Sequence, residues 1–382
     1  MTRTVRLIAI VLLGLFARYT HAADQPIQAD RTPLFVAGVD GYHTYRIPAL
    51  TVTSKGSVLA FCEGRRGGAG DAGDIDLLIK RSLDNGQTWS SQAVVWDDAN
   101  NTCGNPCPIV DRDTGTIWLL MTWNLGRDRE SQIKDQTSQD TRRVYVTHSR
   151  DDGVTWAEPT EITSTTKREN WTWYATGPGA GIQIEHGKYR GRLVAPCDHI
   201  EAQTKHFYSH VIYSDDQGKT WQLGGRTAQA QVNECEVVEI ADGKLLLNMR
   251  NYDRAHKARQ IAVSEDGGLT WRDQRFDEAL IEPICQASVR RVRWPDGDKP
   301  GILLFSNPAD QDQRANMTVR VSLDDGATWP HSGILHAGPS AYSDLAVLPS
   351  GQVGCLYERG ESKPYDMIEF CSFELSALDA GL

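Results

Sequence analysis

The sequence predicts an all-β protein, a six-bladed β-propeller whose blades each contain four antiparallel strands. The first observation is a repeat, because the pattern SxDxGxTW begins at residues 82, 149, 214, 264 and 322. The second is the spacing of the repeats, 50 to 67 residues, which fits four short strands with their loops but leaves no room for long regular helices. The third is that further strand-like segments, without the repeat, precede and follow the five copies.

Each repeat is predicted to be the turn of a β-hairpin. The residues before it alternate polar with apolar or run apolar, as in DIDLLIKRS and MTVRVS, and another short extended segment follows the tryptophan. In such a turn, Ser and Asp side chains accept hydrogen bonds from backbone N–H groups, Gly adopts a positive φ, and Trp buries a large surface. The repeats themselves are therefore interpreted as scaffold.

The two ends of the chain are predicted to form the sixth blade together. Strand-like residues at 33–38 and 45–61 precede the first repeat, and those at 341–358 and 367–375 follow the last one. Pairing strands from both termini would close the ring and remove open sheet edges.

The amino terminus resembles a secretory signal peptide. A short basic run, MTRTVR, precedes the apolar run LIAIVLLGLFA and the small residues of THAA. We expect residues 1–23 to be the signal peptide and residues 24–382 the propeller domain, which would be secreted or periplasmic. The apolar run is short for a membrane span, so stable membrane insertion is not expected, with a retained anchor as the alternative.

Composition excludes some classes of function. The net charge of −10, from 40 basic and 50 acidic residues, argues against nonspecific nucleic-acid binding, which requires a basic face. An anionic ligand would need a local basic pocket. Of the eight cysteines, only Cys103 and Cys107 lie in a loop-like segment, TCGNPCP, and whether they form a disulfide is left open. No Cys or His spacing typical of a zinc site is present, so we expect no metal. We also expect no cofactor, and a protein that is a monomer.

The five repeats resemble the Asp-boxes of bacterial-type exo-α-sialidases, and YRIPAL at 45–50 resembles the Arg-Ile-Pro motif of that family. The resemblance covers nearly the whole chain after the signal peptide. It implies a sialidase-type propeller and a retaining exo-α-sialidase that removes terminal sialic acids from glycoproteins, glycolipids or oligosaccharides. A noncatalytic sialoglycan-binding propeller is the alternative from another class. Transfer to an acceptor sugar and preference for deaminated sialic acid also stay open.

The resemblance implies three arginines that bind the substrate carboxylate. Arg46 in YRIP, Arg250 in LNMRNY and Arg314 in QDQRANM match them, with Arg320 as a neighbour of the third. Arginine suits this role because its planar fork binds a carboxylate through two hydrogen bonds and remains charged. Glu358 in CLYERG resembles the carboxylate that orients Arg46.

A tyrosine nucleophile is also implied. Sialidases are an exception among glycosidases in using tyrosine, and a carboxylate nucleophile would be repelled by the carboxylate on the reacting carbon. Tyr342 in AYSDL resembles this nucleophile, and Glu234 in NECEVVE resembles its base. Glu236 is the rival, since alternation would place it on the same face of a regular strand as Glu234.

The general acid is expected on a glycine-rich loop. In EGRRGGAGDAGDIDLLIKRS, Asp71 matches the acid/base of the family, whereas Asp74 and Asp76 fall where the next strand begins. Arg65 is expected to contact a ring substituent of the sugar, with Arg66 as its rival. The segments MTWN and WTWYATGPGAGIQ are assigned to packing rather than to substrate contact.

Overall fold

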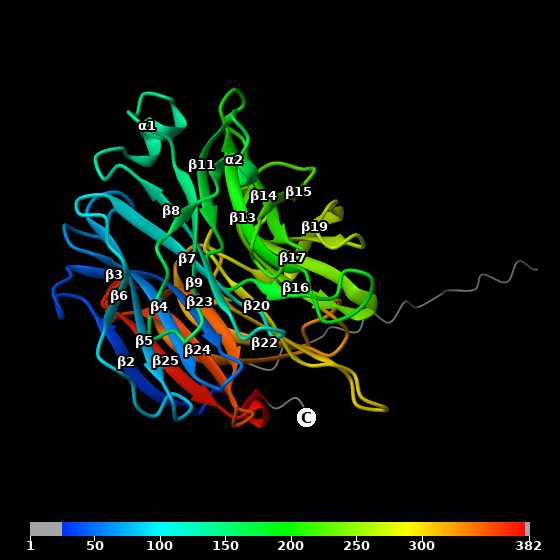
Figure 1. Cartoon of the computed structure of the whole chain (residues 1–382). Helices are drawn as coiled ribbons and strands as arrows, with labels where there is room; N and C mark the ends of the chain where they lie inside the picture. Colours follow the sequence, from blue (N-terminus) through cyan, green and yellow to red (C-terminus); the bar gives the residue numbers. More distant parts are fainter. Residues whose placement is uncertain (1–24, 379–382) are drawn as a thin grey trace, which may run out of the picture.

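A computed structural model describes residues 25–378, and the predicted signal peptide at residues 1–23 lies outside this part (Figure 1). Strands dominate it, which confirms the all-β class. Its helical elements are short: α1 Glu130–Lys134, α2 Thr163–Thr166, and two 3₁₀ turns at Ala241–Gly243 and Leu375–Leu378. Among these described residues, no helix has the length and apolar character needed to cross a membrane.

The strands form four hydrogen-bonded sheets. The first has the order β10-β9-β8-β7-β5-β4-β3, with β6 paired to β5; its bounds are β3 Thr44–Val52, β4 Val58–Arg65, β5 Ile75–Ser82, β6 Ala93–Trp96, β7 Thr102–Val110, β8 Ile117–Asn124, β9 Arg143–Ser149 and β10 Thr160–Glu161. The second contains β11 Trp171–Thr176, β12 Ile182–Gln183, β13 Leu193–Glu201, β14 Phe207–Ser214 and β15 Gln222–Arg226. The third contains β16 Val232–Ile240, β17 Lys244–Asn251, β18 Ala258–Ser264 and β19 Arg272–Ile281.

The fourth sheet joins the two ends of the chain. It has the order β2-β25-β24-β23-β22-β21-β20, with β1 paired to β23; its bounds are β1 Gln25–Pro26, β2 Asp30–Val36, β20 Ser288–Arg293, β21 Ile302–Pro308, β22 Ala315–Ser322, β23 His331–Val347, β24 Val353–Arg359 and β25 Met367–Phe373. The antiparallel pairing of β2 with β25 confirms the predicted pairing of strands from the two ends of the chain. In Figure 1 these two strands, in blue and red, lie side by side.

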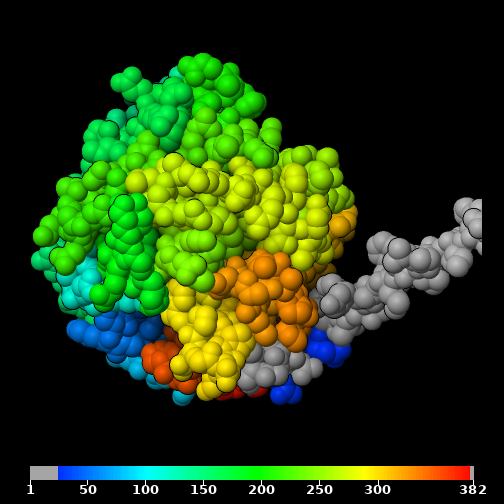
Figure 2. All heavy atoms as spheres, turned by 90° about the vertical axis from the view of Figure 1, so that its right-hand side faces the viewer, coloured from blue at the N-terminus to red at the C-terminus, as the bar shows by residue number. Residues whose placement is uncertain are grey.

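Each of the two eight-stranded sheets has one position where two sets of strands are connected only by a single residue pair or by one long strand. A single parallel pair, Ile75 with Thr102, links β5 to β7 in the first sheet. In the fourth sheet the 17-residue strand β23 pairs with β22 through its first part and with β24 through its second. Figure 2 shows successive chain segments following one another around the molecule, from green through yellow to orange.

The five repeats form the predicted turns. In the first copy, the Ser82 hydroxyl accepts a hydrogen bond from the Gly86 N–H at 2.8 Å and donates one to the Asp84 carboxylate at 2.8 Å. The Asp84 carboxylate also accepts hydrogen bonds from the backbone N–H and the hydroxyl of Thr88, at 2.8 and 2.6 Å. These contacts lower the pKa of Asp84 to about 2, led by the Thr88 hydroxyl. Gly86 has a φ of +87°.

The repeats lie on one face of the molecule. The strand that leads into a repeat is antiparallel to the strand before it in the sequence. Thus β5 begins beside the end of β4, and β18 begins beside the end of β17. Arg65 ends β4 and Arg250 lies near the end of β17, whereas the repeats start at the far ends of β5 and β18. The turns are therefore on the face opposite to these two arginines.

The cysteine prediction needs a correction. The TCGNPCP segment is not a loop but the buried strand β7, and all eight cysteines of the chain are free thiols. A β-bulge between Gly104 and Cys107 sends the two side chains in different directions. Cys103 packs with the apolar cluster of β4, β5 and β8, and Cys107 packs with the cluster that extends to β13 and β14.

Candidate active site

A cavity of about 380 Å³ opens on the face opposite to the repeat turns. It lies where β3, β7 and β16 begin and where β4 and β17 end. All seven residues predicted to contact the substrate line it: Arg46, Arg65, Asp71, Glu234, Arg250, Arg314 and Tyr342. They come from segments as far apart as β3 and β23, so the fold brings together positions that are separated by almost 300 residues.

Three guanidinium groups converge on Tyr342. Arg46 and Arg314 lie with their guanidinium carbons 5.1 and 5.6 Å from the centroid of its ring. Arg250 donates a hydrogen bond to its hydroxyl at 3.0 Å. Tyr365 contributes a second aromatic face, 4.2 Å from Arg46, and accepts a hydrogen bond from Arg314 at 2.8 Å. This cluster can hold one carboxylate by several charge-assisted hydrogen bonds.

Glu358 fixes both Arg46 and the backbone of Tyr342. One carboxylate oxygen accepts hydrogen bonds from Arg46 Nε at 2.6 Å and from the Ile47 N–H at 2.9 Å. The other accepts the N–H of Tyr342 at 3.1 Å. Burial opposes the charge on Arg46, but the Glu358 carboxylate together with Tyr365 and Tyr342 raises the pKa of Arg46. Glu358 is fully buried and makes no direct contribution to the cavity wall.

Tyr342 and Glu234 form a short hydrogen bond. The phenol donates to one Glu234 oxygen at 2.5 Å, and Arg250 donates to the other at 2.6 Å. Burial and the Glu234 charge raise the pKa of Tyr342, while the three arginines act in the opposite direction. The phenol is therefore neutral at rest, next to a carboxylate that can accept its proton.

Asp71 lies on the β4–β5 loop and pairs with Arg65. Their atoms approach to 2.8 Å, and Arg65 is itself held by Glu63 at 2.6 Å and by the Ala69 carbonyl at 2.6 Å. The Asp71 side chain is 60% exposed whereas Arg65 is buried. The cavity partly shields Asp71 from water, which opposes its ionisation, but the charges of Arg65, Arg46 and Arg142 together lower the pKa of Asp71. At rest Asp71 is thus a carboxylate rather than an acid.

The rival acidic residues lie elsewhere. Glu236 is fully buried beneath the cavity and accepts hydrogen bonds from the Ser288 hydroxyl at 3.0 Å and the Val289 N–H at 2.9 Å. Asp74 and Asp76 both pair with Arg66, at 3.2 and 2.7 Å, outside the cavity.

The sequence interpretation missed several residues that line the cavity. They are Glu63, Asn105, Glu130, Arg142, Trp173, Asp198, Phe207, Asn233, Tyr252 and Tyr365. Two of the segments assigned to packing take part: Trp173 lines the wall, and Asn124 of the MTWN segment holds Arg142 at 2.7 Å. The unusual density of aromatic and glycine residues in WTWYATGPGAGIQ was the signal that could have identified this wall.

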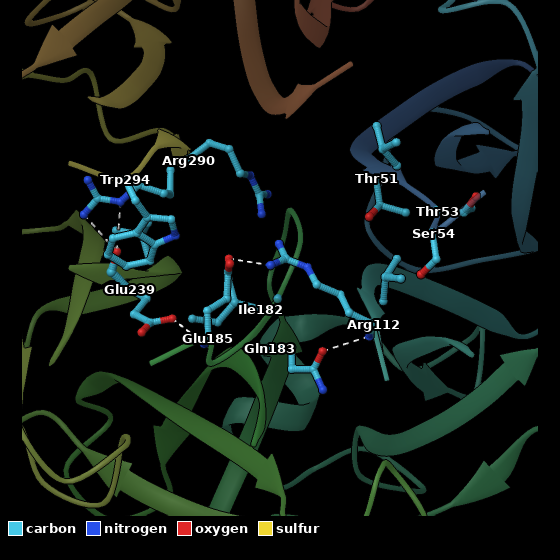
Figure 3. Close-up of a pocket in the computed structure, with 15 residues that line it drawn as sticks. Thr51, Thr53, Ser54, Arg112, Ile182, Gln183, Glu185, Glu239, Arg290 and Trp294 are labelled. Atoms are coloured by element: carbon cyan, nitrogen blue, oxygen red, sulfur yellow. Dashed lines mark hydrogen bonds and ion pairs between the residues drawn. The ribbon is translucent and has the colours of Figure 1, made fainter. Parts of the chain in front are cut away.

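A second cavity, of about 400 Å³, lies at the opposite ends of β3, β7 and β16 (Figure 3). Arg112 and Arg290 reach into it from different walls. Both already have carboxylate partners, since Arg112 pairs with Glu185 at 2.5 Å and Arg290 contacts Asp344 at 3.3 Å. Although this cavity is slightly larger than the first, its charged groups neutralise one another, and we assign it no reaction.

Comparison with known proteins shows the family of this chain. Residues 56–355 match the BNR repeat-like domain family. The sialidase of Micromonospora viridifaciens is 35% identical over 98% of this chain, and mouse sialidase-2 is 31% identical over 88% of it. This chain spans 60% of the length of the Micromonospora relative and 93% of the mouse protein.

Solved structures give the same result. The structure of the Hadza microbial sialidase Hz136 superimposes with a TM-score of 0.81 at 32% identity, covering 91% of this chain and 69% of that one. The propeller-type fold is thereby shared with a sialidase. With the repeats, the fold and the relatives in agreement, this chain belongs to the sialidase family with BNR repeats, a family of glycoside hydrolases.

Proposed function

We propose that this protein is a retaining exo-α-sialidase that uses Tyr342 as its nucleophile. The observation that carries the proposal is the Tyr342–Glu234 hydrogen bond of 2.5 Å inside a cavity where three arginines surround the same tyrosine. The arginines suit the carboxylate of a sialic acid. The neutral phenol avoids the repulsion that a charged nucleophile would meet beside that carboxylate.

In the first step, the sialic acid carboxylate binds Arg46, Arg250 and Arg314. Glu234 takes the phenol proton while the tyrosine oxygen bonds to the anomeric carbon, and the bond from that carbon to the leaving oxygen breaks. Asp71 gives its proton to the leaving oxygen. The arginines that surround Tyr342 stabilise the phenolate character that develops on its oxygen.

In the second step, a water molecule replaces the aglycone. Asp71, now a carboxylate, takes a proton from this water as its oxygen attacks the anomeric carbon. The bond to the Tyr342 oxygen breaks, and Glu234 returns the proton to the phenolate. Two displacements at one carbon retain the configuration.

The resting pair of Asp71 with Arg65 imposes a requirement on this mechanism. A general acid needs a proton, and the Arg65 charge keeps Asp71 ionised at rest. Substrate binding must therefore separate the two side chains, so that Asp71 takes up a proton from solvent before the first step. The loop that carries Asp71 can allow this, because Gly68 and Gly73 have φ values of +151° and +140° and no neighbours within 4 Å of an added Cβ.

The finer fold prediction is part of the same proposal. The first sheet can be divided at the single Ile75–Thr102 pair, and the fourth sheet within β23, between its pairing with β22 and its pairing with β24. The chain then has six units of four principal strands. We infer that these units are the six blades. We also retain the expectation of export through the signal peptide at residues 1–23, and of action on sialylated glycoproteins, glycolipids or oligosaccharides.

A fluorogenic aryl glycoside of N-acetylneuraminic acid tests the activity. We expect hydrolysis by the wild-type protein and a loss of kcat/KM of at least about 100-fold in Arg250→Lys, because one ammonium cannot replace two directed hydrogen bonds. A wild-type protein that binds this glycoside without cleaving it would instead support the noncatalytic alternative. Adding an acceptor sugar separates hydrolysis from transfer, since transfer would give a new sialoside.

The role of Asp71 has its own signature. Asp71→Ala should reduce cleavage of natural sialosides, whose leaving groups need a proton, much more than cleavage of aryl sialosides. Equal losses on both substrates would argue against Asp71 as the acid.

A further inference from the structure

Asp198 is a buried acid in the wall of the active-site cavity. It lies in β13 and is only 1% exposed. Within residues 25–378 its Oδ2 atom is buried and has no hydrogen-bond partner. Its neighbours on the paired strands are Ala175 and Ser209, and the Ser209 hydroxyl donates to the Asn233 carbonyl instead. This part of the chain thus gives the Oδ2 atom none of the hydrogen bonds that a buried carboxylate needs.

A second acid, Glu234, lies close to Asp198 in the same cavity wall. The Cys235 thiol donates to the Cys197 carbonyl at 3.4 Å, so β13 and β16 are in contact at the residues adjacent to the two acids. Arg250 donates to Glu234 at 2.6 Å and stabilises its carboxylate. Burial, followed by the Glu234 charge, raises the pKa of Asp198 well above its ordinary value. Of the two acids, Glu234 is therefore the carboxylate, and Asp198 holds a proton.

The other ionisable groups around Asp198 do not reverse this. The groups that face it are two acids, two arginines, two phenols and two thiols: Glu130 of α1, Glu234 of β16, Arg142 before β9, Arg250 and Tyr252 at the end of β17, and the buried Tyr174, Cys197 and Cys235. The two arginines favour ionisation of Asp198, whereas burial and the two acids oppose it and together prevail. The phenols and thiols are neutral, because burial raises the pKa of each. A proton on Asp198 thus keeps one negative charge out of the cavity.

The substrate of the proposed function brings a negative charge of its own. A sialic acid carboxylate must enter a cavity whose wall already holds Glu234 and Asp71 as carboxylates. An ionised Asp198 would add another negative charge at a buried position, where repulsion is strong and salt screens it little. A neutral Asp198 avoids this repulsion and leaves the arginines to attract the substrate.

We propose that Asp198 controls substrate binding through its own protonation: as a neutral acid it allows an anionic sugar to bind, and as a carboxylate it repels one. The inference rests on the proposed function, since it requires a substrate with a carboxylate. Loss of the Asp198 proton to solvent should limit kcat/KM at alkaline pH, mainly by raising KM. Because the linkage is reciprocal, the bound carboxylate favours the proton on Asp198. The alkaline fall of kcat should therefore lie at higher pH than that of kcat/KM.

Asp198→Asn tests the inference, because the amide resembles the acid in shape and stays neutral at every pH. Hydrolysis of the aryl sialoside is measured from about pH 5 to about pH 10 for both proteins. On the alkaline side, kcat/KM of the wild-type protein should fall about 10-fold per pH unit. Asp198→Asn should stay within about 3-fold of the wild-type value at about pH 6, and its fall should begin at least about 1 pH unit higher. Glu201→Gln, in the same strand but paired with Arg226 outside the cavity, is the matched control and should keep the wild-type profile.

Infrared spectra give a readout that does not depend on turnover. The wild-type protein at neutral pH should show the C=O stretch of a protonated carboxyl that is absent from Asp198→Asn, and this band should disappear over the pH range in which kcat/KM falls. Asp198→Ser, which is also neutral, keeps the test decisive if the asparagine variant does not fold.

Three results would overturn the inference and leave the proposed function intact. They are a wild-type kcat/KM that stays flat to about pH 10, an alkaline fall that is unchanged in the folded variants, and a loss by the same factor at every pH, which would show a merely structural role. A wild-type protein that cleaves no sialoside at any pH would overturn the proposed function, and this inference with it.

Discussion

Glu358→Gln should destabilise the protein and disable the active site at the same time. The carboxylate accepts three hydrogen bonds, from Arg46, Ile47 and Tyr342. If the glutamine oxygen accepts from Arg46 and Ile47, its NH₂ group faces the N–H of Tyr342. Two hydrogen-bond donors then face each other, because the carboxylate oxygen that accepted the Tyr342 N–H is gone. The substitution also leaves the buried Arg46 charge without its counter-charge.

The expected magnitude follows from these contacts. Breaking a buried ion pair by removing one charge costs about 3–5 kcal/mol, and part of that cost is the orphaned N–H of Tyr342. For roughly 350 folded residues this corresponds to a fall in Tm of about 4–7 °C. Because Glu358 holds both an arginine and the backbone of the proposed nucleophile, kcat/KM should also fall, by about 100-fold or more.

Thermal unfolding and aryl sialoside kinetics measure the two effects on the same preparation. Glu361→Gln, an exposed glutamate a few residues along the chain, is the matched control and should change neither value. An unchanged Tm together with an unchanged kcat/KM in Glu358→Gln would refute the assignment of Glu358 as the residue that orients Arg46 and Tyr342.

Two further predictions concern stability. Trp156→Ala should lower the free energy of unfolding by about 3 kcal/mol, since Trp156 packs edge-on against buried Phe61. The kcat of the folded variant should remain near normal, because the repeat turns lie opposite the cavity. A large loss of kcat at unchanged stability would contradict the scaffold role of the repeats. Acid should destabilise the fold through the buried His199–His210 pair, because burial lowers the pKa of His210 to about 3 and lowers the pKa of His199 well below its ordinary value of 6.5. Their contribution is complete above pH 6.5 and is lost as the pH falls towards 3, at up to about 1.4 kcal/mol per pH unit for each histidine. Denaturant unfolding of wild-type protein and His210→Gln between pH 7.5 and 4.5 checks this, and parallel pH profiles would contradict it.

The repeats predicted much of the fold because each turn depends on local contacts. Ser82, Asp84 and Gly86 satisfy one another within five residues, so the pattern specifies the turn without tertiary information. The pairing of strands from the two ends of the chain was also predictable, because both ends are strand-like and lack the repeat. The Cys103–Cys107 segment was misread as a loop because the bulge that separates the two thiols depends on pairing with β8, which the sequence does not display.

The candidate site was predicted where a motif marks a residue and missed where only tertiary contacts do. Arg46 and Tyr342 stand in recognisable motifs. Arg142 stands next to Arg143 just before a strand, and neighbouring side chains there face opposite ways. Alternation indicates that one arginine points inward, but only the contacts of Arg143 with Asp140 and of Arg142 with Trp173 show which one does. The Asp71–Arg65 pair likewise depends on how the loop folds back.

The most direct test of the central claim is covalent trapping of Tyr342. A fluorinated sialosyl fluoride should lose fluoride as the tyrosine oxygen bonds to the anomeric carbon, and the electron-withdrawing ring fluorine slows the second step. Mass spectrometry should then show one added sugar on the tryptic peptide 321–359, with fragmentation assigning it to Tyr342 rather than Tyr357. The Tyr342→Phe protein should show no adduct. An adduct on another residue, or wild-type turnover of natural substrate whose first product is the β-anomer, would contradict the mechanism.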